Sequence, residues 1–149
     1  MKIYRPSKFE KIFPKLIMGQ SLRTGGVSNF PYKSLNLGLN TQDEIHSVNI
    51  NRQIFFDALK IFSDQVVGGL QVHDDLILEV NSGGYHTGYD AFVSQEKGLY
   101  ITIGVADCTP ILIFDSVSLA IGAAHAGWKG TAKNIAGQTF LKMNELYGS

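Results

Sequence analysis

Residues 104–130, GVADCTPILIFDSVSLAIGAAHAGWKG, contain the two apolar runs that decide the fold class. The runs ILIFD and LAIGAA are short and rich in apolar residues, a pattern that predicts β-strands. Because ILIF is apolar throughout, we expect this strand to be buried on both faces. The turn AHAGWKG then leads from the second strand into a helix. The same stretch holds the chain's only cysteine, Cys108, and its only tryptophan, Trp128.

The segments on either side of this stretch continue the alternation of strands and helices. Upstream, four more short apolar runs predict strands: VVGGLQVH, LILEV, DAFVS and ITIGV. Turns between the strands are predicted at Gly83-Gly84, Gly88, Gly98 and Pro110. Downstream, apolar residues at i, i+3 and i+4 spacing predict one helix over about 130–147, and Gly137 within it indicates close packing.

The first forty residues are rich in Gly, Pro and Asn and predict loops around short strands. Thr41 and Glu44 match a T-x-x-E capping box, and the apolar spacing that follows predicts a helix over 44–60. Together these elements predict an α/β fold with a central mixed sheet and helices on its faces.

Composition narrows the class of protein. The 149 residues, 44% hydrophobic and 17% charged, fit one globular domain. A net charge of zero makes a nucleic-acid partner unexpected, because such binding depends on neutralising phosphates. No apolar run is long enough for a signal peptide core or a membrane span. A single cysteine cannot form an internal disulfide, which favours a reducing compartment, and we expect a cytoplasmic protein.

The candidate reactive residues His73, Cys108 and His125 each lie at or just beyond the end of a predicted strand. Strand ends of an α/β sheet commonly converge on one rim, where sites form. Two imidazoles and a thiolate would suit zinc with one open position, and copper accepts the same ligands. The separations of 35 and 17 positions match no short zinc signature. From the residues alone, Cys108 is a core residue, a nucleophile paired with His125, or a metal ligand.

Four neighbouring residues extend this candidate site. Gly127 would let an anion approach the start of the helix after the AHAGWKG turn, where Lys129 adds a positive charge, unless the glycines only shape the turn. Asp107 is a candidate general acid/base or ligand-orienting residue, and it could equally cap a turn. Gln71 shares a strand face with His73 if the strand is regular.

Several motifs, taken in order, resemble the laccase-domain family, also called polyphenol oxidoreductase or YfiH-like proteins, whose members include purine nucleoside phosphorylases. The matching blocks are RTGGVSNFPYKSLNLG, the pair Asn51-Arg52, LQVHDDLILEV, DAFVSQEKGLYITIGVADCTPILIFD and IGAAHAGWKG. ADCxP followed by HAGW[RK]G is the most specific of these patterns.

The resemblance implies a fold, a metal and a reaction. The fold is a layered α/β sandwich with mixed sheets. The metal is zinc, or alternatively copper, held by His73, Cys108 and His125. The reaction is phosphorolysis of adenosine, inosine and methylthioadenosine, with adenosine deaminase activity, so the partners are a purine nucleoside and phosphate. The resemblance places Arg23, Asn36 and Gln71 near the substrate pocket. Arg23 or the Gly127–Gly130 turn would bind phosphate, and Asp107 would move the proton during deamination.

This chain departs from the family pattern at three places. Asp74 replaces the glycine that usually follows QVH, and TQDE at 41–44 replaces an acidic segment. The chain also stops before the family's later G-P-[CS]-I-G segment. We therefore expect residues 1–149 to be a single laccase-like domain that lacks the family's C-terminal third.

Two other functions compete with the nucleoside reaction. One is copper-dependent oxidation of polyphenols, although four histidines are few for a multicopper enzyme. The other is hydrolysis of a peptidoglycan precursor with Cys108 as the nucleophile.

Overall fold

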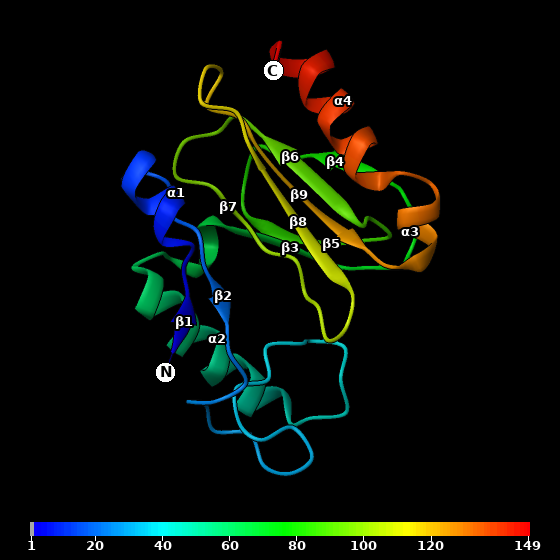
Figure 1. Ribbon diagram of the computed structural model, residues 1–149. Helices are drawn as coiled ribbons and strands as arrows, with labels where there is room; N and C mark the ends of the chain where they lie inside the picture. Colours follow the sequence, from blue (N-terminus) through cyan, green and yellow to red (C-terminus); the bar gives the residue numbers. More distant parts are fainter. Residues whose placement is uncertain (1) are drawn as a thin grey trace. The chain divides into compact units, whose positions relative to one another are not determined.

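The computed structural model describes residues 2–149, which form two compact units, one ending at Ser63 and the other comprising Asp64–Ser149. The described residues combine parallel and antiparallel strand pairs in three sheets with four α-helices (Figure 1). This composition confirms the predicted α/β class with mixed sheets, while the expectation of a single domain stays a prediction. No helix within residues 2–149 has both the length and the apolar character that crossing a membrane requires.

The first unit contains two short strands and two helices. β1 (Ile3–Tyr4) pairs antiparallel with β2 (Gln20–Ser21), and α1 (Ser7–Ile12) lies between them in the sequence. After a long irregular segment, α2 (Ile45–Leu59) completes the unit. These elements confirm both the predicted loops around short strands and the predicted helix over 44–60.

The capping box predicted at Thr41 and Glu44 is wrong. Glu44 itself occupies the N-cap position of α2, and its side chain makes no capping hydrogen bond. The Thr41 hydroxyl instead donates to the Gly38 carbonyl at 3.1 Å and accepts from the Asn36 amide at 2.9 Å. Thr41 therefore stabilises the preceding turn, and the box cannot form because the helix starts later than its spacing implies.

The irregular segment of the first unit is held by a buried side chain of α2, Asn51, which is fully buried. Its Nδ2 donates to the Ser28 hydroxyl at 2.8 Å and to the Asn36 carbonyl at 2.9 Å. Its Oδ1 accepts from the Val27 backbone N–H at 2.8 Å. Since a buried amide must satisfy its donors and acceptor, Asn51 fixes the GGVS loop against α2.

The second unit contains two sheets, and α4 covers one of them (Figure 1). A parallel three-stranded sheet has the order β5 (Gly84–Thr87), β3 (Val66–Leu70), β7 (Tyr100–Ile101). A mixed four-stranded sheet has the order β4 (Ile77–Glu79), β6 (Ala91–Ser94), β9 (Ile121–Ala126), β8 (Thr109–Phe114). The remaining elements are a 3₁₀ turn at Ser63–Gln65 and the helices α3 (Trp128–Ala132) and α4 (Ile135–Tyr147).

Alternating residues of β6 divide the core of the second unit into layers. Phe92 packs with Val67 of β3, on the side of the three-stranded sheet. Its neighbours Ala91 and Val93 point to the other face, where they meet Ile135 and Met143 of α4 respectively. Because successive strand residues face opposite sides, this buried strand joins the two sheets and α4 into a layered sandwich.

The prediction that ILIF is buried on both faces is wrong. β8, which contains this run, is the outermost strand of the described sheet, and Leu112 is 53% exposed. Pro110, expected to mark a turn, is instead the second residue of β8. Proline has no backbone N–H to donate to a neighbouring strand. An outermost strand tolerates it, because such a strand has a neighbour on one side only.

Three further boundaries differ from the prediction. The helix predicted over 130–147 is two helices, separated at Asn134, which adopts a left-handed conformation (φ 58°) and caps α4 through its side chain. Of the predicted strand ITIGV, only the first residue, Ile101, is in a strand. β5 lies where Gly83-Gly84 and Gly88 had predicted turns. Gly137 makes room for the side chain that caps its own helix, because a Cβ there would lie 2.4 Å from Asn134 Nδ2.

Candidate metal centre

Three side chains from separate segments of the second unit converge at one point. His73, Cys108 and His125 each offer one potential ligand atom, and these atoms lie within 4.8 Å of one another. The two imidazole rings meet edge to face, with their centroids 4.6 Å apart. Among residues 2–149 this is the one such group of three or more histidine, cysteine or acidic side chains. The residues that the sequence singles out as ligands can therefore share one ion.

The register of β8 and β9 explains why Cys108 and His125 meet. In this antiparallel pair Thr109 lies opposite Ala126, and Pro110 lies opposite His125. Cys108 immediately precedes β8, so it is next to the end of β9, where His125 is the penultimate residue. Pairing of the two strands thus joins residues that are far apart in sequence.

His73 reaches the same point from the loop between β3 and β4. Its backbone is left-handed, with φ 59°. This conformation disfavours a residue with a side chain by roughly 1–2 kcal/mol. The surrounding loop must offset that energy, and it does so through backbone hydrogen bonds to one buried carboxylate, Asp90.

Asp90 is a residue that the sequence analysis missed. It is fully buried immediately before β6, and its carboxylate lies 2.8 Å from His125 Nδ1. With Nδ1 engaged by Asp90, Nε2 is the His125 nitrogen left to bind a metal, an arrangement common among metal-binding histidines. One feature of the sequence could have indicated Asp90: it directly precedes the apolar run AFVS. Acidic residues are rarely buried unless they have a partner, so an acid at this position predicts one.

Gly127 leaves the space that the three ligands need. A Cβ at this position would lie 3.2 Å from His73 Cδ2 and 3.5 Å from both Cys108 Sγ and His125 Cε1. Its φ of −72° is open to any residue, so the absence of a side chain matters for room rather than for backbone freedom. Gly127 therefore forms a cradle beside the ligand atoms.

The donor set and its spacing fit a zinc ion. Bonds of about 2.0–2.3 Å at tetrahedral angles place neighbouring ligand atoms roughly 3.3–3.6 Å apart. The observed separations of up to 4.8 Å would close by about one ångström. His73 is exposed and Cys108 is partly exposed, whereas His125 is buried, so small rotations of the outer two side chains would suffice and one side stays open for a fourth ligand.

The surroundings of Cys108 oppose its use as a free nucleophile. Burial, followed by the negative charge of Asp107, raises the pKa of the Cys108 thiol. Catalytic cysteines need the opposite shift, which nearby positive charge provides. A divalent cation would supply that charge and favour the thiolate, so the position suits a ligand better than a nucleophile.

Gln71 connects the two loops that carry His73 and Cys108. Its Nε2 donates to the Gly104 carbonyl at 2.8 Å, and its Oε1 accepts from the Gly104 N–H at 2.9 Å. Both ends of the amide are therefore used within the protein. The regular strand expected to extend to His73 ends at Leu70, so the predicted shared face is replaced by this paired contact.

The turn after His125 presents an exposed aromatic and a cation. Trp128 is 76% exposed, and Lys129 Nζ lies 5.5 Å from the centroid of its ring. The helix that starts here, α3, has only five residues. Because a short helix contributes little dipole, the predicted attraction of anions to this turn would depend mainly on the charge of Lys129.

Two predicted substrate residues, Arg23 and Asn36, belong to the first unit. Arg23 donates to the carbonyls of Lys33 at 2.9 Å and Pro31 at 3.3 Å, and its side chain is exposed. The Asn36 Nδ2 donates to Asp43 at 3.0 Å as well as to Thr41. Both side chains thus shape their own loop, and their contact with substrate stays a prediction.

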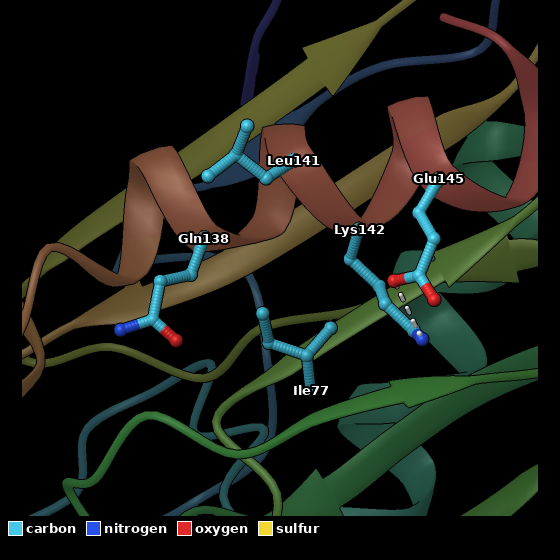
Figure 2. A pocket seen from close by; sticks show the side chains of 5 residues that line it. All are labelled: Ile77, Gln138, Leu141, Lys142 and Glu145. Carbon is cyan, nitrogen blue, oxygen red and sulfur yellow. Dashed lines mark hydrogen bonds and ion pairs between the residues drawn. The ribbon is translucent and has the colours of Figure 1, made fainter.

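A surface hollow of about 260 Å³ lies elsewhere in the second unit, between α4 and Ile77 of β4. Figure 2 shows its lining of Ile77, Gln138, Leu141, Lys142 and Glu145, with an ion pair between Lys142 and Glu145 at 3.2 Å. It contains none of the predicted site residues, so we assign the chemistry to the convergence of His73, Cys108 and His125.

Comparison with known proteins places the chain in a family. The sequence profile described as "Multi-copper polyphenol oxidoreductase laccase" matches residues 17–149. The chain belongs to this laccase family. Family membership confirms the resemblance inferred from the ADCxP and HAGWKG motifs.

Relatives within the laccase family carry names of purine nucleoside enzymes. Purine nucleoside phosphorylase YlmD of Bacillus subtilis (strain 168) is 33% identical over 145 residues, which cover 91% of this chain and 52% of the relative. Purine nucleoside phosphorylase of Deinococcus radiodurans is 40% identical over 124 residues, covering 83% and 48% respectively. The crystal structure of the hypothetical protein YfiH of Bacillus licheniformis matches with a TM-score of 0.83 at 33% identity, covering 88% and 53%. The chain thus spans about half the length of these relatives.

Proposed function

We propose that this chain carries the metal-binding part of a zinc-dependent purine nucleoside phosphorylase. The observation that supports this most directly is the convergence of His73, Cys108 and His125 within 4.8 Å, on a chain whose relatives are named for this reaction. The proposal includes adenosine, inosine and methylthioadenosine as substrates and deamination of adenosine as a second reaction. The metal requires a reduced thiol, which agrees with the proposed cytoplasmic location.

In this proposal each residue of the centre has a defined task. His73, Cys108 and His125 hold the metal, which when bound would supply a Lewis acid. Lys129, exposed beside the cradle, attracts the phosphate whose oxygen forms the new bond to C1′ of ribose as the bond to the base breaks. Asp107, exposed next to Cys108, moves the proton that the departing base or the deamination step requires.

Arg23 is the second candidate for phosphate in this proposal. Only part of its guanidinium is used by the Lys33 and Pro31 carbonyls, and a guanidinium has five N–H donors. Asn36 and Gln71 act through the loops that they hold in place.

The proposal is tested by the reaction itself. Zinc-loaded protein is incubated with inosine or adenosine plus phosphate, and free base and ribose 1-phosphate are separated by chromatography, with the Bacillus subtilis relative as positive control. We expect turnover that falls at least a hundredfold in Cys108→Ala and His125→Ala, because each removes one of three ligands. Asp115→Asn, which lies in the turn between β8 and β9 away from the centre, should leave turnover unchanged.

Two results would reject the proposal. One is undiminished turnover in the ligand variants, which would exclude a role for the metal. The other is a wild-type chain that binds no zinc, because the proposal assigns the metal-binding part of the enzyme to this chain.

Neither alternative function gains support from the geometry. Polyphenol oxidation by several coppers would require further ligand groups, whereas residues 2–149 bring together one group of three. Hydrolysis by a Cys108 nucleophile conflicts with the raised pKa of its thiol. Iodoacetamide distinguishes a metal ligand from a free nucleophile. A metal-bound thiolate is modified slowly until a chelator is added, whereas a free nucleophile reacts at once.

A further inference from the structure

The Asp90 carboxylate gathers hydrogen bonds from two segments that each carry a metal ligand. Its Oδ1 accepts from the His73 backbone N–H at 2.9 Å and lies 2.8 Å from His125 Nδ1. Its Oδ2 accepts from the backbone N–H groups of Val72 and Asp74, both at 3.0 Å. One fully buried side chain thus touches the loop of the first ligand and the ring of the third.

We propose that Asp90 is a positioning residue that presets two of the three ligands, His73 through its backbone and His125 through its ring, before a metal binds. This inference rests on the metal site proposed above. Asp90 would not bind the metal itself, but it would hold two of the ligands in the geometry that metal binding requires.

For His125 the carboxylate selects the tautomer. A carboxylate only accepts hydrogen bonds, so the contact with Nδ1 places a proton on Nδ1, and the neutral form of the ring then has its lone pair on Nε2. The His125 side chain is only 3% exposed, so solvent hardly competes for that position. The backbone N–H of His125 also donates to the Asp90 carbonyl at 2.7 Å, which fixes the strand that carries the ring.

For His73 the carboxylate holds the backbone. Three consecutive N–H groups, from Val72 to Asp74, converge on one side chain, and the middle residue has the left-handed φ of 59°. Such a concave set of N–H groups binds an anion, and here Asp90 is that anion. Without it these N–H groups would lose their partner, and the left-handed conformation would lose their support.

Asp90→Asn would disturb one ligand in either orientation of the new amide, which has one accepting oxygen and one donating nitrogen. With the oxygen near His125, the NH₂ group faces the N–H groups of Val72 and Asp74, and the loop opens. With the amide turned over, the NH₂ group faces His73 N–H and donates to Nδ1, which moves the His125 proton to Nε2 and blocks the metal-binding lone pair.

The test uses ¹⁵N-labelled histidine in the metal-free protein. Protonated and unprotonated ring nitrogens have well-separated ¹⁵N shifts, which identify the tautomer of each ring. We expect His125 in the wild type to carry its proton on Nδ1. A wild-type His125 protonated on Nε2 would overturn the inference, whatever the variants do.

Two variants complete the experiment. In Asp90→Asn we expect an altered His125 signal and a zinc affinity, measured by chelator competition, that is lower by roughly ten- to hundredfold. The matched control is Asp115→Asn, because Asp115 also accepts from backbone N–H groups, those of Val117 at 2.9 Å and Ser118 at 3.2 Å. The control should keep the wild-type tautomer and affinity.

The outcomes separate this inference from the proposed function. Unchanged tautomer and affinity in a folded Asp90→Asn protein would overturn the positioning role. Absence of zinc binding by the wild type would instead overturn the metal site itself.

Discussion

Replacing Gly127 with alanine should weaken metal binding while leaving the fold intact. The new methyl carbon would lie 3.2 Å from His73 Cδ2 and 3.5 Å from Cys108 Sγ and His125 Cε1. The His73 ring must then move away by a few tenths of an ångström. Zinc binding requires the opposite movement, because the distances between the ligand atoms must shorten by about one ångström. We expect the affinity for zinc to fall about tenfold, the lower end of the range for residues that support metal ligands.

The stability of the Gly127→Ala protein should change by no more than about 1 kcal/mol. The residue has φ −72° and ψ 177°, which alanine adopts freely, and the main loss is the modest preference for glycine over alanine at an N-cap. The assay pairs competition with a chromophoric chelator with unfolding in urea.

Gly104→Ala is the matched control for this substitution. It adds the same methyl group in the loop before Cys108, at an ordinary 3.4 Å from Gln71 Oε1. We expect wild-type zinc affinity in this variant. If Gly127→Ala binds zinc as tightly as the wild type, the cradle argument is refuted.

Three further predictions concern stability. Asn51→Ala should lower the free energy of unfolding by about 3 kcal/mol, because it removes the hydrogen bonds of this buried amide with the Ser28 hydroxyl, the Asn36 carbonyl and the Val27 N–H, whereas Asn49→Ala, exposed on the same helix, should change little in urea titrations. The Ser118 hydroxyl lowers the pKa of Asp115 from 3.8 to about 2, so stability present above 3.8 should be lost as the pH falls toward 2, and Asp115→Asn should flatten that dependence. Lys133→Ala removes exposed ion pairs to Asp74 and Asp75 and should lower the stability only slightly, and less at high salt; a large, salt-independent loss would contradict this.

The sequence predicted the strands that bury apolar residues and the convergence of the ligands, but not the edges of the sheets. Ile111 and Ile113 of the ILIF run pack against the core. A run that is apolar at every position could not show that β8 would be the outermost strand. The apolar spacing of the last helix runs past Asn134 without interruption, so the break depends on a left-handed residue that only local hydrogen bonding reveals.

The convergence of His73, Cys108 and His125 was predicted, whereas the buried carboxylate beside them was missed. Cys108 and His125 stood out because their side chains bind metals, whatever the fold. Asp90 did not, because its role depends on three loop N–H groups and one ring nitrogen that only the folded chain brings together. The strand face that Gln71 was expected to share with His73 does not form, because the strand ends at Leu70 and Gln71 pairs with Gly104 instead.

The decisive question is whether His73, Cys108 and His125 together hold one metal ion. Elemental analysis of purified protein, with zinc and copper counted per chain, tests it most directly. We expect about one zinc per chain in the wild type and in Asp115→Asn, and a large loss in Cys108→Ala and in His125→Ala. A wild-type protein that retains no metal after zinc loading, or ligand variants that keep as much zinc as the wild type, would contradict it.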